Sequence, residues 1–216
     1  MTHTVRLLIA SRNQKKLDEL NFILNQQLGK THALPDFKIH LVSLNEFPGI
    51  TEVIEDGETF EANAVKKALG YAKQTKCLTL ADDSGLAVEA LGGAPGVQSA
   101  RFAGEGKDDL ANCQLVFDRL KNVPHEKRQA KFVCVVALAS PEELIGTRKG
   151  EVHGFITHEL RGDGGFGYDP MFFYPPFKKT LAEVSPSQKS QVSHRSKALE
   201  SVQPLLLQYL RLKYDN

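Results

Sequence analysis

Residues 81–96 read Ala81-Asp82-Asp83-Ser84-Gly85-Leu86-Ala87-Val88-Glu89-Ala90-Leu91-Gly92-Gly93-Ala94-Pro95-Gly96. The apolar run before them, residues 77–81, predicts a strand that ends at the two aspartates. Because side chains alternate along a strand, Asp82 and Asp83 are expected to point in opposite directions, one toward a cleft and the other into the turn. A carboxylate at a strand end beside glycine-rich backbone suits a magnesium ion that also holds phosphate oxygens. A solvated acidic turn has the same composition, so the rest of the chain must decide between the two interpretations.

Strands and helices alternate in the first half of the chain. We predict strands over 5–10, 39–44 and 77–81, and amphipathic helices over about 14–28 and 59–73. Gly29 is the expected end of the first helix, whose apolar stripe is Leu17, Leu20, Leu24 and Leu28. Loops are expected over 30–36 and over 45–58, an acidic segment that contains proline and glycine.

The second half predicts a hairpin between two helices. A helix over 108–121 is expected to bury Leu110, Cys113, Phe117 and Leu120. Long strands over 131–139 and 144–156 predict an antiparallel hairpin, and a glycine-rich loop over 161–169 precedes a short strand over 171–174. The last helix, 193–213, is expected to be interrupted or kinked at Pro204. The pattern favours one domain of the α/β class with a mixed sheet.

The composition excludes several classes of protein. Apolar residues make up 41% and charged residues 25% of 216 residues, as in an ordinary soluble globular protein. A net charge of +1 argues against a nucleic-acid polymer as partner, so any anionic ligand must be held by a few placed cations. The three cysteines, Cys77, Cys113 and Cys134, lack metal-ligand spacing and are expected to be free thiols in a reducing compartment. With no signal-peptide pattern and no apolar run long enough to span a bilayer, we expect a cytoplasmic protein without a membrane partner.

Two clusters of polar residues in the first half of the chain could bind phosphate. Ser11, Asn13 and Lys16 lie where the first strand meets the first helix, and amides at a helix N-terminus attract phosphate. The glycines of a Walker loop are missing, and an ordinary N-cap followed by solvated lysines fits this segment as well. In the second helix Asn63 and Lys67 are i, i+4 neighbours, although a single helical lysine is usually only a solubilising residue.

Two further clusters in the second half could hold a base. Residues 162–170 pack four glycines around Phe166, Tyr168 and two carboxylates, so that an aromatic side chain could stack on a base. The alternative is a tight loop with its aromatic side chains in the core. Lys189, His194 and Arg195 offer donors at the start of the last helix, where Ser193 is the expected N-cap, and a capped, solvated helix start is the alternative.

Taken together and in this order, the segments resemble the inosine triphosphate pyrophosphatase family. The matching segments are 11–16 (SRNQKK), 59–64 (TFEANA) with Lys67-Ala68, 81–96 with 99–102 (SARF), 164–170 (GGFGYDP), and Lys189-Ser190 with 193–195 (SHR). The resemblance implies an elongated mixed sheet flanked by helices, in one bilobed domain over 1–216 with the active cleft between its lobes. It also implies a homodimer that hydrolyses deaminated purine nucleoside triphosphates (ITP, dITP and XTP) with Mg²⁺ to the monophosphate and pyrophosphate.

The resemblance also assigns roles to individual residues. Asp83 would be the general base and a magnesium ligand, and Glu55 the second magnesium ligand. The triphosphate and sugar would be held by Ser11, Arg12, Asn13, Gln14, Lys15, Lys16, Lys67 and Ser84. The base would be held by Phe166, Gly167, Tyr168, Asp169, Lys189, His194 and Arg195.

Several points stay open at this stage. Arg12 stands where the family has glycine or another small residue, which leaves the backbone path of the first loop undecided. Glu52 or Asp56 could replace Glu55 as the metal ligand, because the acidic loop has no strict motif. A related pyrophosphatase for other modified nucleotides, a nucleotide-binding regulator without catalysis and a structural or partner-binding role are the alternative functions.

Overall fold

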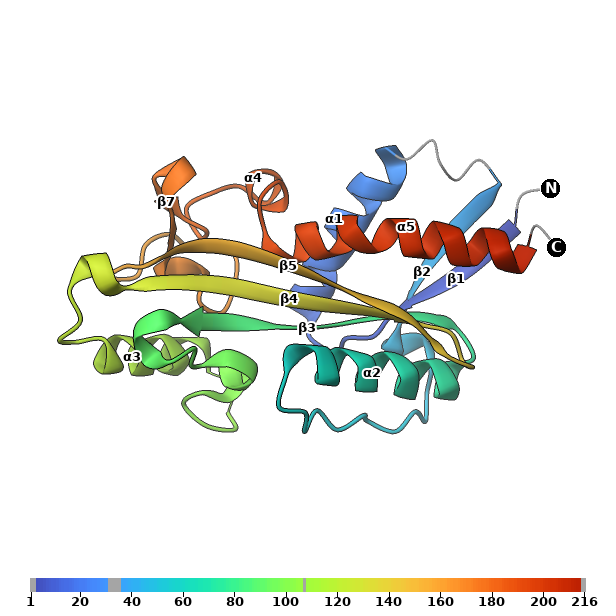
Figure 1. Cartoon of the computed structure of the whole chain (residues 1–216), viewed down its shortest axis with the longest axis horizontal. Helices are drawn as coiled ribbons and strands as arrows, with labels where there is room; N and C mark the ends of the chain where they lie inside the picture. Colours follow the sequence, from blue (N-terminus) through green and yellow to red (C-terminus); the bar gives the residue numbers. More distant parts are fainter. Residues whose placement is uncertain (1–2, 31–35, 107, 215–216) are drawn as a thin grey trace. The chain divides into compact units, whose positions relative to one another are not determined.

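The computed structural model describes residues 3–30, 36–106 and 108–214. The chain forms two compact units, which Figure 1 shows in sequence colours. The first unit consists of Met1–Asp83, Val135–Gly150 and Arg195–Asn216, and the second of Ser84–Cys134 and Glu151–His194. Among the described residues, no helix combines the length and the apolar character needed to cross a membrane.

The strands form one mixed sheet in the order β2-β1-β3-β4-β5-β6-β7. β1 (His3–Ile9) pairs in parallel with β2 (Phe37–Ser43) and with β3 (Leu78–Val88). β4 (Gln129–Ala139) and β5 (Leu144–Ile156) are sheet neighbours joined by residues 140–143, which is the predicted hairpin. β6 (Phe172–Tyr174) pairs antiparallel with β5 and with β7 (Lys179–Thr180). The predicted α/β class with a mixed sheet is confirmed.

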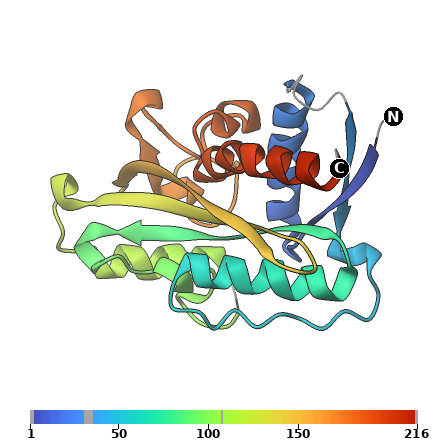
Figure 2. The same cartoon turned by 45° about the vertical axis from the view of Figure 1, so that its right-hand side comes forward.

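The first unit is built on two parallel strand–helix–strand crossovers. α1 (Gln14–Lys30) connects β1 to β2, and α2 (Phe60–Thr75) leads into β3. Figures 1 and 2 show α2 on one face of these strands, and α1 and α5 (His194–Tyr214) on the other. The core face of α2 is Ala64, Ala68, Tyr71 and Ala72, all at most 3% exposed. Small side chains on this face let α2 pack closely on the strands.

The second unit packs its helices on two faces of its strands. α3 (Asp109–Arg119) lies on one face and α4 (Pro186–Ser190) on the other, as Figure 2 shows. The buried stripe of α3 is Asn112, Cys113 and Val116, continued by Leu120 directly after the helix, and each of these residues is at most 2% exposed. This stripe is rotated from the predicted one, which leaves Phe117 partly buried on its flank and Leu110 68% exposed, so the prediction for Leu110 was wrong.

β3 differs most from its prediction. It continues through Asp82 and Asp83 to Val88 instead of ending at the aspartates. Gly85 does not form a turn. A Cβ at this position would lie 2.2 Å from the Ser99 side-chain oxygen, so the glycine allows a close approach of residues 96–99. The predicted turn was wrong because Leu86 and Val88 are fully buried and extend the strand.

The remaining differences are smaller. Gly29 lies inside α1 and does not end it, and α5 continues through Pro204 without interruption. The side chain of Leu28 and most of the predicted loop over 30–36 fall outside the described residues. α4 and β7 were not predicted. All three cysteines are buried free thiols, as expected.

Candidate active site

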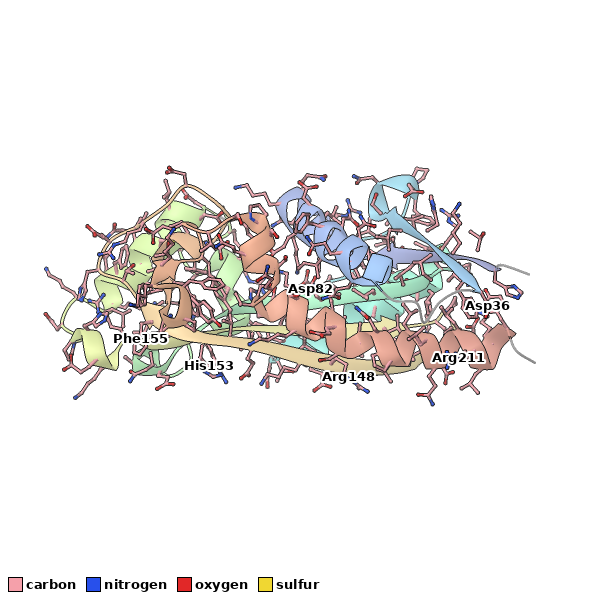
Figure 3. All side chains as sticks on the ribbon, turned by 90° about the horizontal axis from the view of Figure 1, so that it is seen from above. Asp36, Asp82, Arg148, His153, Phe155 and Arg211 are labelled. Atoms are coloured by element: carbon pink, nitrogen blue, oxygen red, sulfur yellow. The ribbon has the colours of Figure 1, made fainter. Side chains whose placement is uncertain are left out.

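The sheet register brings Asp82 beside the turn that follows β1. Ile9 is the partner of Leu80 in the parallel pair, and the Ala10 amide donates to the Leu80 carbonyl over 2.9 Å. β3 continues where β1 ends, so Asp82 lies next to the start of α1. In Figure 3 Asp82 lies inside the first unit, whereas Arg148 and Arg211 lie at its outer edge. The alternation of side chains then sends Asp82 toward α1 and α5, and Asp83 toward α2.

Asp82 is a buried carboxylate held by cations. The Lys16 ammonium lies 2.9 Å from its Oδ2, and the Arg195 Nε lies 3.7 Å from the same oxygen. Burial alone would raise the pKa of this carboxyl, but Lys16, Arg195 and Lys67 outweigh burial and lower it to about 2. Arg195 also donates from Nη1 to Glu19 Oε2 over 3.0 Å, so two carboxylates hold this guanidinium. Asp82 therefore stays ionised and fixes Lys16 and Arg195.

Asp83 has a different environment. Its Oδ2 accepts a hydrogen bond of 3.0 Å from the Asn63 side chain, and its Oδ1 lies 4.0 Å from the Lys67 ammonium. Burial raises the pKa of Asp83 above its ordinary value, because Lys67 and Lys16 only partly offset the loss of solvation. The two neighbouring carboxyls thus have pKa values shifted in opposite directions. A carboxylate with a raised pKa is the better proton acceptor of the two.

Lys67 connects the two aspartates to the acidic loop. The residue is only 6% exposed, and its ammonium donates to the Asp82 carbonyl and to Glu55 Oε2, each over 2.7 Å. Burial would lower the pKa of Lys67, but Asp82, Glu55 and Asp83 together raise it, so the lysine is a buried cation. The interpretation of Lys67 as a solubilising surface residue is wrong.

The acidic loop is fixed by Asn63. The Asn63 side chain accepts from the Gly57 amide over 2.7 Å and donates to the Gly57 carbonyl over 3.3 Å. Of the three carboxylates considered in this loop, Glu55 is brought to Lys67, whereas Asp56 pairs with Lys66 and Glu52 is exposed. Lys66 lowers the pKa of Asp56.

The donors present fit a magnesium ion. Glu55 and Asp83 approach the same ammonium, so two carboxylates converge on one position of positive charge. Across the described parts of the chain, no group of three or more His, Cys, Asp or Glu side chains gathers to enclose a metal. Magnesium is typically bound by one or two protein carboxylates, with waters and substrate phosphates as its other ligands. The donor set suits this arrangement.

The segment 11–16 begins α1 with ordinary backbone geometry. The Asn13 amide donates to the Ser11 hydroxyl and the Lys16 amide donates to the Asn13 side chain, each over 3.2 Å. Among the described non-glycine residues, Lys76 and Lys178 have positive φ, so Arg12 does not adopt left-handed backbone. Lys16 reaches Asp82, whereas Arg12, Gln14 and Lys15 are exposed.

The second unit holds a separate cluster in its glycine-rich loop, residues 162–169. Asp169 Oδ2 accepts from the Lys189 ammonium over 2.7 Å and from the Phe166 amide over 2.9 Å, and the same ammonium lies 5.1 Å from the centre of the Phe166 ring. Asp169 and Lys189 are 2% and 7% exposed. Gly165 has φ +69°, and a Cβ there would lie 2.1 Å from Asp169 Oδ2, so the loop requires glycine at this position.

Three further residues predicted to hold the base make contacts of their own within the protein. Tyr168 is buried, and its hydroxyl donates to the Ser99 carbonyl over 2.8 Å. His194 is 2% exposed and stacks on Phe132 with ring centres 4.8 Å apart. Arg195 belongs to the first unit, on Asp82 and Glu19. Ser84 is half-buried in β3. The roles of these residues toward a ligand stay predictions.

Sequence analysis assigned no site role to four residues that organise the two clusters: Asp82, Glu19, Asn63 and Asp109. The alternation along the strand had marked Asp82 together with Asp83, and Glu19 was recognisable from its i, i+3 spacing to Lys16 on one helix face. Asn63 was noted only as a neighbour of Lys67. No sequence signal marks Asp109, which accepts from the Gly167 amide across 58 residues of chain.

The fold agrees with comparisons to known proteins. The model of the Ham1 family matches residues 7–205. This chain belongs to the Ham1 family.

Similar proteins with names or solved structures extend over nearly the whole chain. The chain is 48% identical over 202 residues to the dITP/XTP pyrophosphatase of Desulforamulus reducens, covering 94% of this chain and 96% of the relative. It is 48% identical over 194 residues to the protein of the same name from Geobacter sulfurreducens, covering 90% and 92%. A HAM1 protein structure from Coxiella burnetii aligns with a TM-score of 0.81 at 37% identity, covering 94% of this chain and 99% of that one.

Proposed function

We propose that this protein is a dITP/XTP pyrophosphatase, which hydrolyses deaminated purine nucleoside triphosphates, ITP included, to the monophosphate and pyrophosphate and so removes them from the nucleotide pool. The observation that carries the proposal is the pair of neighbouring carboxyls on β3. Asp82 has its pKa lowered to about 2 and binds Lys16, whereas Asp83 has its pKa raised and lies beside Lys67. One carboxyl therefore holds cations for an anionic ligand, and the other is suited to accept a proton.

In the proposed reaction, Asp83 orients a water molecule and accepts its proton as the water oxygen attacks the α-phosphorus. The bond between the α-phosphorus and the oxygen bridging to the β-phosphorus breaks, and pyrophosphate leaves with that oxygen. Lys16 and Lys67 supply positive charge to the phosphate oxygens, where negative charge develops. The backbone and side chains at the start of α1, residues 11–15, and the Ser84 hydroxyl would contact the triphosphate and sugar.

Asp83 and Glu55 would hold Mg²⁺, since they are the carboxylates that converge on one position beside β3. When bound, Mg²⁺ offsets charge on the phosphate oxygens. The protein's own contribution is to keep these carboxylates in place, Glu55 through Lys67 and Asp83 through Asn63.

Base selection is proposed for the buried pair Lys189–Asp169 with the Phe166 ring. An ammonium and a carboxylate side by side offer one donor and one acceptor. Hypoxanthine and xanthine present the complementary pair, a 6-oxo acceptor and an N1–H donor, whereas adenine presents the reverse. A site built around such bonds can reject the mismatched base by about 10⁴-fold. Guanine shares the 6-oxo and N1–H pattern, so rejecting it requires a further contact with its 2-amino group.

The assembly and location that we propose follow the resemblance of the chain to its family: a homodimer that acts on free nucleotides in the cytoplasm, without a membrane or a nucleic-acid polymer as partner. Sedimentation equilibrium at micromolar concentration tests the dimer directly.

A nucleotide panel tests the activity. The protein is incubated with Mg²⁺ and ITP, XTP, dITP, GTP, ATP or dUTP, and monophosphate, pyrophosphate and orthophosphate are measured. We expect turnover of the first three with pyrophosphate as product. Orthophosphate as product would contradict the cleavage site, and a preference for dUTP would indicate a pyrophosphatase for other modified nucleotides. Binding without turnover would indicate a regulator.

The variant Asp83→Asn separates an enzyme from a binding protein. Asparagine keeps the shape of the side chain but is not a base, so we expect turnover to fall by about 10³-fold, within the range of general-base catalysis. Binding of a non-hydrolysable ITP analogue, measured by calorimetry, is expected to stay within severalfold of the wild-type value. Parallel loss of binding and turnover would show that Asp83 acts only as a metal or structural anchor.

A further inference from the structure

The glycine-rich loop is held by helix α3 through the backbone of a single residue. The Gly167 amide donates to Asp109 Oδ2 over 2.9 Å, and the Cys113 thiol donates to the Gly167 carbonyl over 3.6 Å. Both polar backbone groups of Gly167 are therefore used by one face of α3. Gly167 has φ +60°, a conformation that glycine adopts without strain.

A second contact holds the next residue of the loop. Tyr168 is 5% exposed, and its hydroxyl donates to the Ser99 carbonyl over 2.8 Å. The Ser99 hydroxyl in turn donates to the Gly96 carbonyl over 2.6 Å and accepts from the Leu86 amide over 2.9 Å, so the segment that receives Tyr168 is itself fixed to β3. The Tyr168 ring is thus an anchor in the core of the second unit.

The residues on either side of these anchors form the Lys189–Asp169–Phe166 cluster. Asp169 accepts from the Phe166 amide, so the position of Phe166 depends on the path of the backbone through Gly167 and Tyr168. Cys113 remains a donor because burial, then the negative charges of Asp109 and Asp169, raise the pKa of its thiol to about 12.

We propose that Asp109 is a positioning residue for base recognition, which sets the loop 162–169 through the Gly167 amide, with Tyr168 and Ser99 as the second anchor. Neither Asp109 nor Ser99 needs to touch the nucleotide. They act by keeping the Phe166 ring and the Asp169–Lys189 pair in place before the base arrives. Preorganisation of this kind lowers the entropy cost of binding. The inference rests on the proposed function where it concerns the base, whereas the contact itself does not depend on that function.

The test compares the same substitution at two neighbouring positions. Asp109→Ser removes the carboxylate that accepts from the Gly167 amide and leaves a shorter side chain in its place. Asp108→Ser also removes one charge from the start of α3 but keeps the N-cap, since Asp108 accepts from the Leu110 and Ala111 amides and serine is a good cap. Hydrogen exchange of residues 162–169 is measured first, without nucleotide. We expect faster exchange of the Gly167 amide in D109S than in D108S, and equal exchange in the two variants would overturn the anchor.

Steady-state kinetics with dITP and dATP then test base recognition. In D109S we expect KM for dITP to rise about fivefold, which corresponds to the loss of one hydrogen bond. We expect kcat to stay within twofold of wild type because Asp83, Lys16 and Lys67 are unchanged. The preference for dITP over dATP is expected to narrow by the same factor. Tyr168→Phe, which removes only the hydroxyl, is expected to act in the same direction. An unchanged KM and preference in D109S, or an equal effect in D108S, would overturn the positioning role.

The two proposals fail separately. If the wild-type protein does not turn over the nucleotide panel, the proposed function is wrong, whereas the exchange comparison still decides whether Asp109 holds the loop.

Discussion

The two clusters of this protein are built in different ways. In the first unit, Lys16, Lys67 and Arg195 come from three helices and meet carboxylates of β3, α1 and the acidic loop in side-chain ion pairs. In the second unit, one loop folds around Asp169 and Lys189, and backbone groups of Phe166 and Gly167 make the bonds that hold it.

The difference fits the ligands that we propose for each cluster, a triphosphate for the first and a purine base for the second. Ion pairs between side chains can exchange partners, so cations held by Asp82 and Glu55 can be shared with phosphate oxygens when a triphosphate enters. A planar base gains little from such exchange, because its recognition depends on a few hydrogen bonds at fixed positions. We therefore expect the first cluster to respond to changes in charge and the second to changes in backbone position.

The largest effect is expected from Asp82→Asn, which tests whether charge organises the first cluster. The change leaves Lys16 without its carboxylate partner and Arg195 with Glu19 alone, so we expect the free energy of unfolding in urea to fall by about 3 kcal/mol. Turnover should fall by at least about 100-fold. Asp118→Asn is the control: this exposed carboxylate accepts a hydrogen bond from Gln114 in the same helix, and the free energy of unfolding should stay within about 0.5 kcal/mol of wild type. Equal stability of the two variants would contradict the role of Asp82.

Glu55→Gln and Asp56→Asn test which acidic-loop carboxylate serves the first cluster. Glu55 contacts buried Lys67, whereas Asp56 pairs with exposed Lys66. We expect E55Q to raise the Mg²⁺ concentration for half-maximal activity about tenfold, which is the usual size of the loss when one group that supports a metal is removed. D56N is expected to leave this concentration unchanged. A magnesium titration of both variants decides the question, and the reverse result would make Asp56 the ligand.

The smallest effect at neutral pH, and a distinct one at high pH, is expected from Cys113→Ser in the second cluster. Folding raises the pKa of this thiol from 9.0 to about 12, mainly by burial. A raised pKa means that the folded state holds the proton more tightly, so its contribution to stability is complete below pH 9 and is lost as the pH rises toward 12. Between pH 9.5 and 10.5 the free energy of unfolding of the wild-type protein should fall by about 1.4 kcal/mol more than that of C113S, which has no thiol at position 113. Parallel pH profiles in urea unfolding would show that the thiol ionises freely.

Much of the fold could be predicted from the sequence because periodicity reports on burial. The strand–helix alternation, the hairpin and the core face of α2 follow from apolar spacing alone. The predicted end of β3 was wrong because Asp, Ser and Gly favour a turn locally. The strand continues because of tertiary packing, namely the burial of Leu86 and Val88 and the close approach of Ser99. The predicted buried face of α3 was wrong for a related reason. A few apolar residues in a short helix are compatible with two different faces, and only tertiary packing decides which face is buried.

The sequence predicted which residues belong to the candidate site, but not which of them contact one another. Asp83, Lys16, Lys67 and Glu55 were candidates from the sequence, and the structure brings them to β3. Arg195 and His194 are adjacent in the chain, but one lies on Asp82 and the other on Phe132, because successive helix residues point about 100° apart. The contact of Asp109 with Gly167 joins an exposed side chain to a backbone amide, and no sequence pattern encodes such a pair.

The unbroken course of β3 limits how this gene can vary in length. Insertions in the loop before α3 leave the strand pairing intact and are expected to be tolerated. One residue inserted or deleted between the pairing with β1 and Asp82 would turn both aspartates to the opposite faces, exchanging the side chain that faces α1 with the one that faces α2. Two residues would restore the faces but displace the carboxylates by about 6.6 Å along the strand. Variation in length is therefore expected to be excluded from residues 80–83, even where single substitutions nearby are accepted.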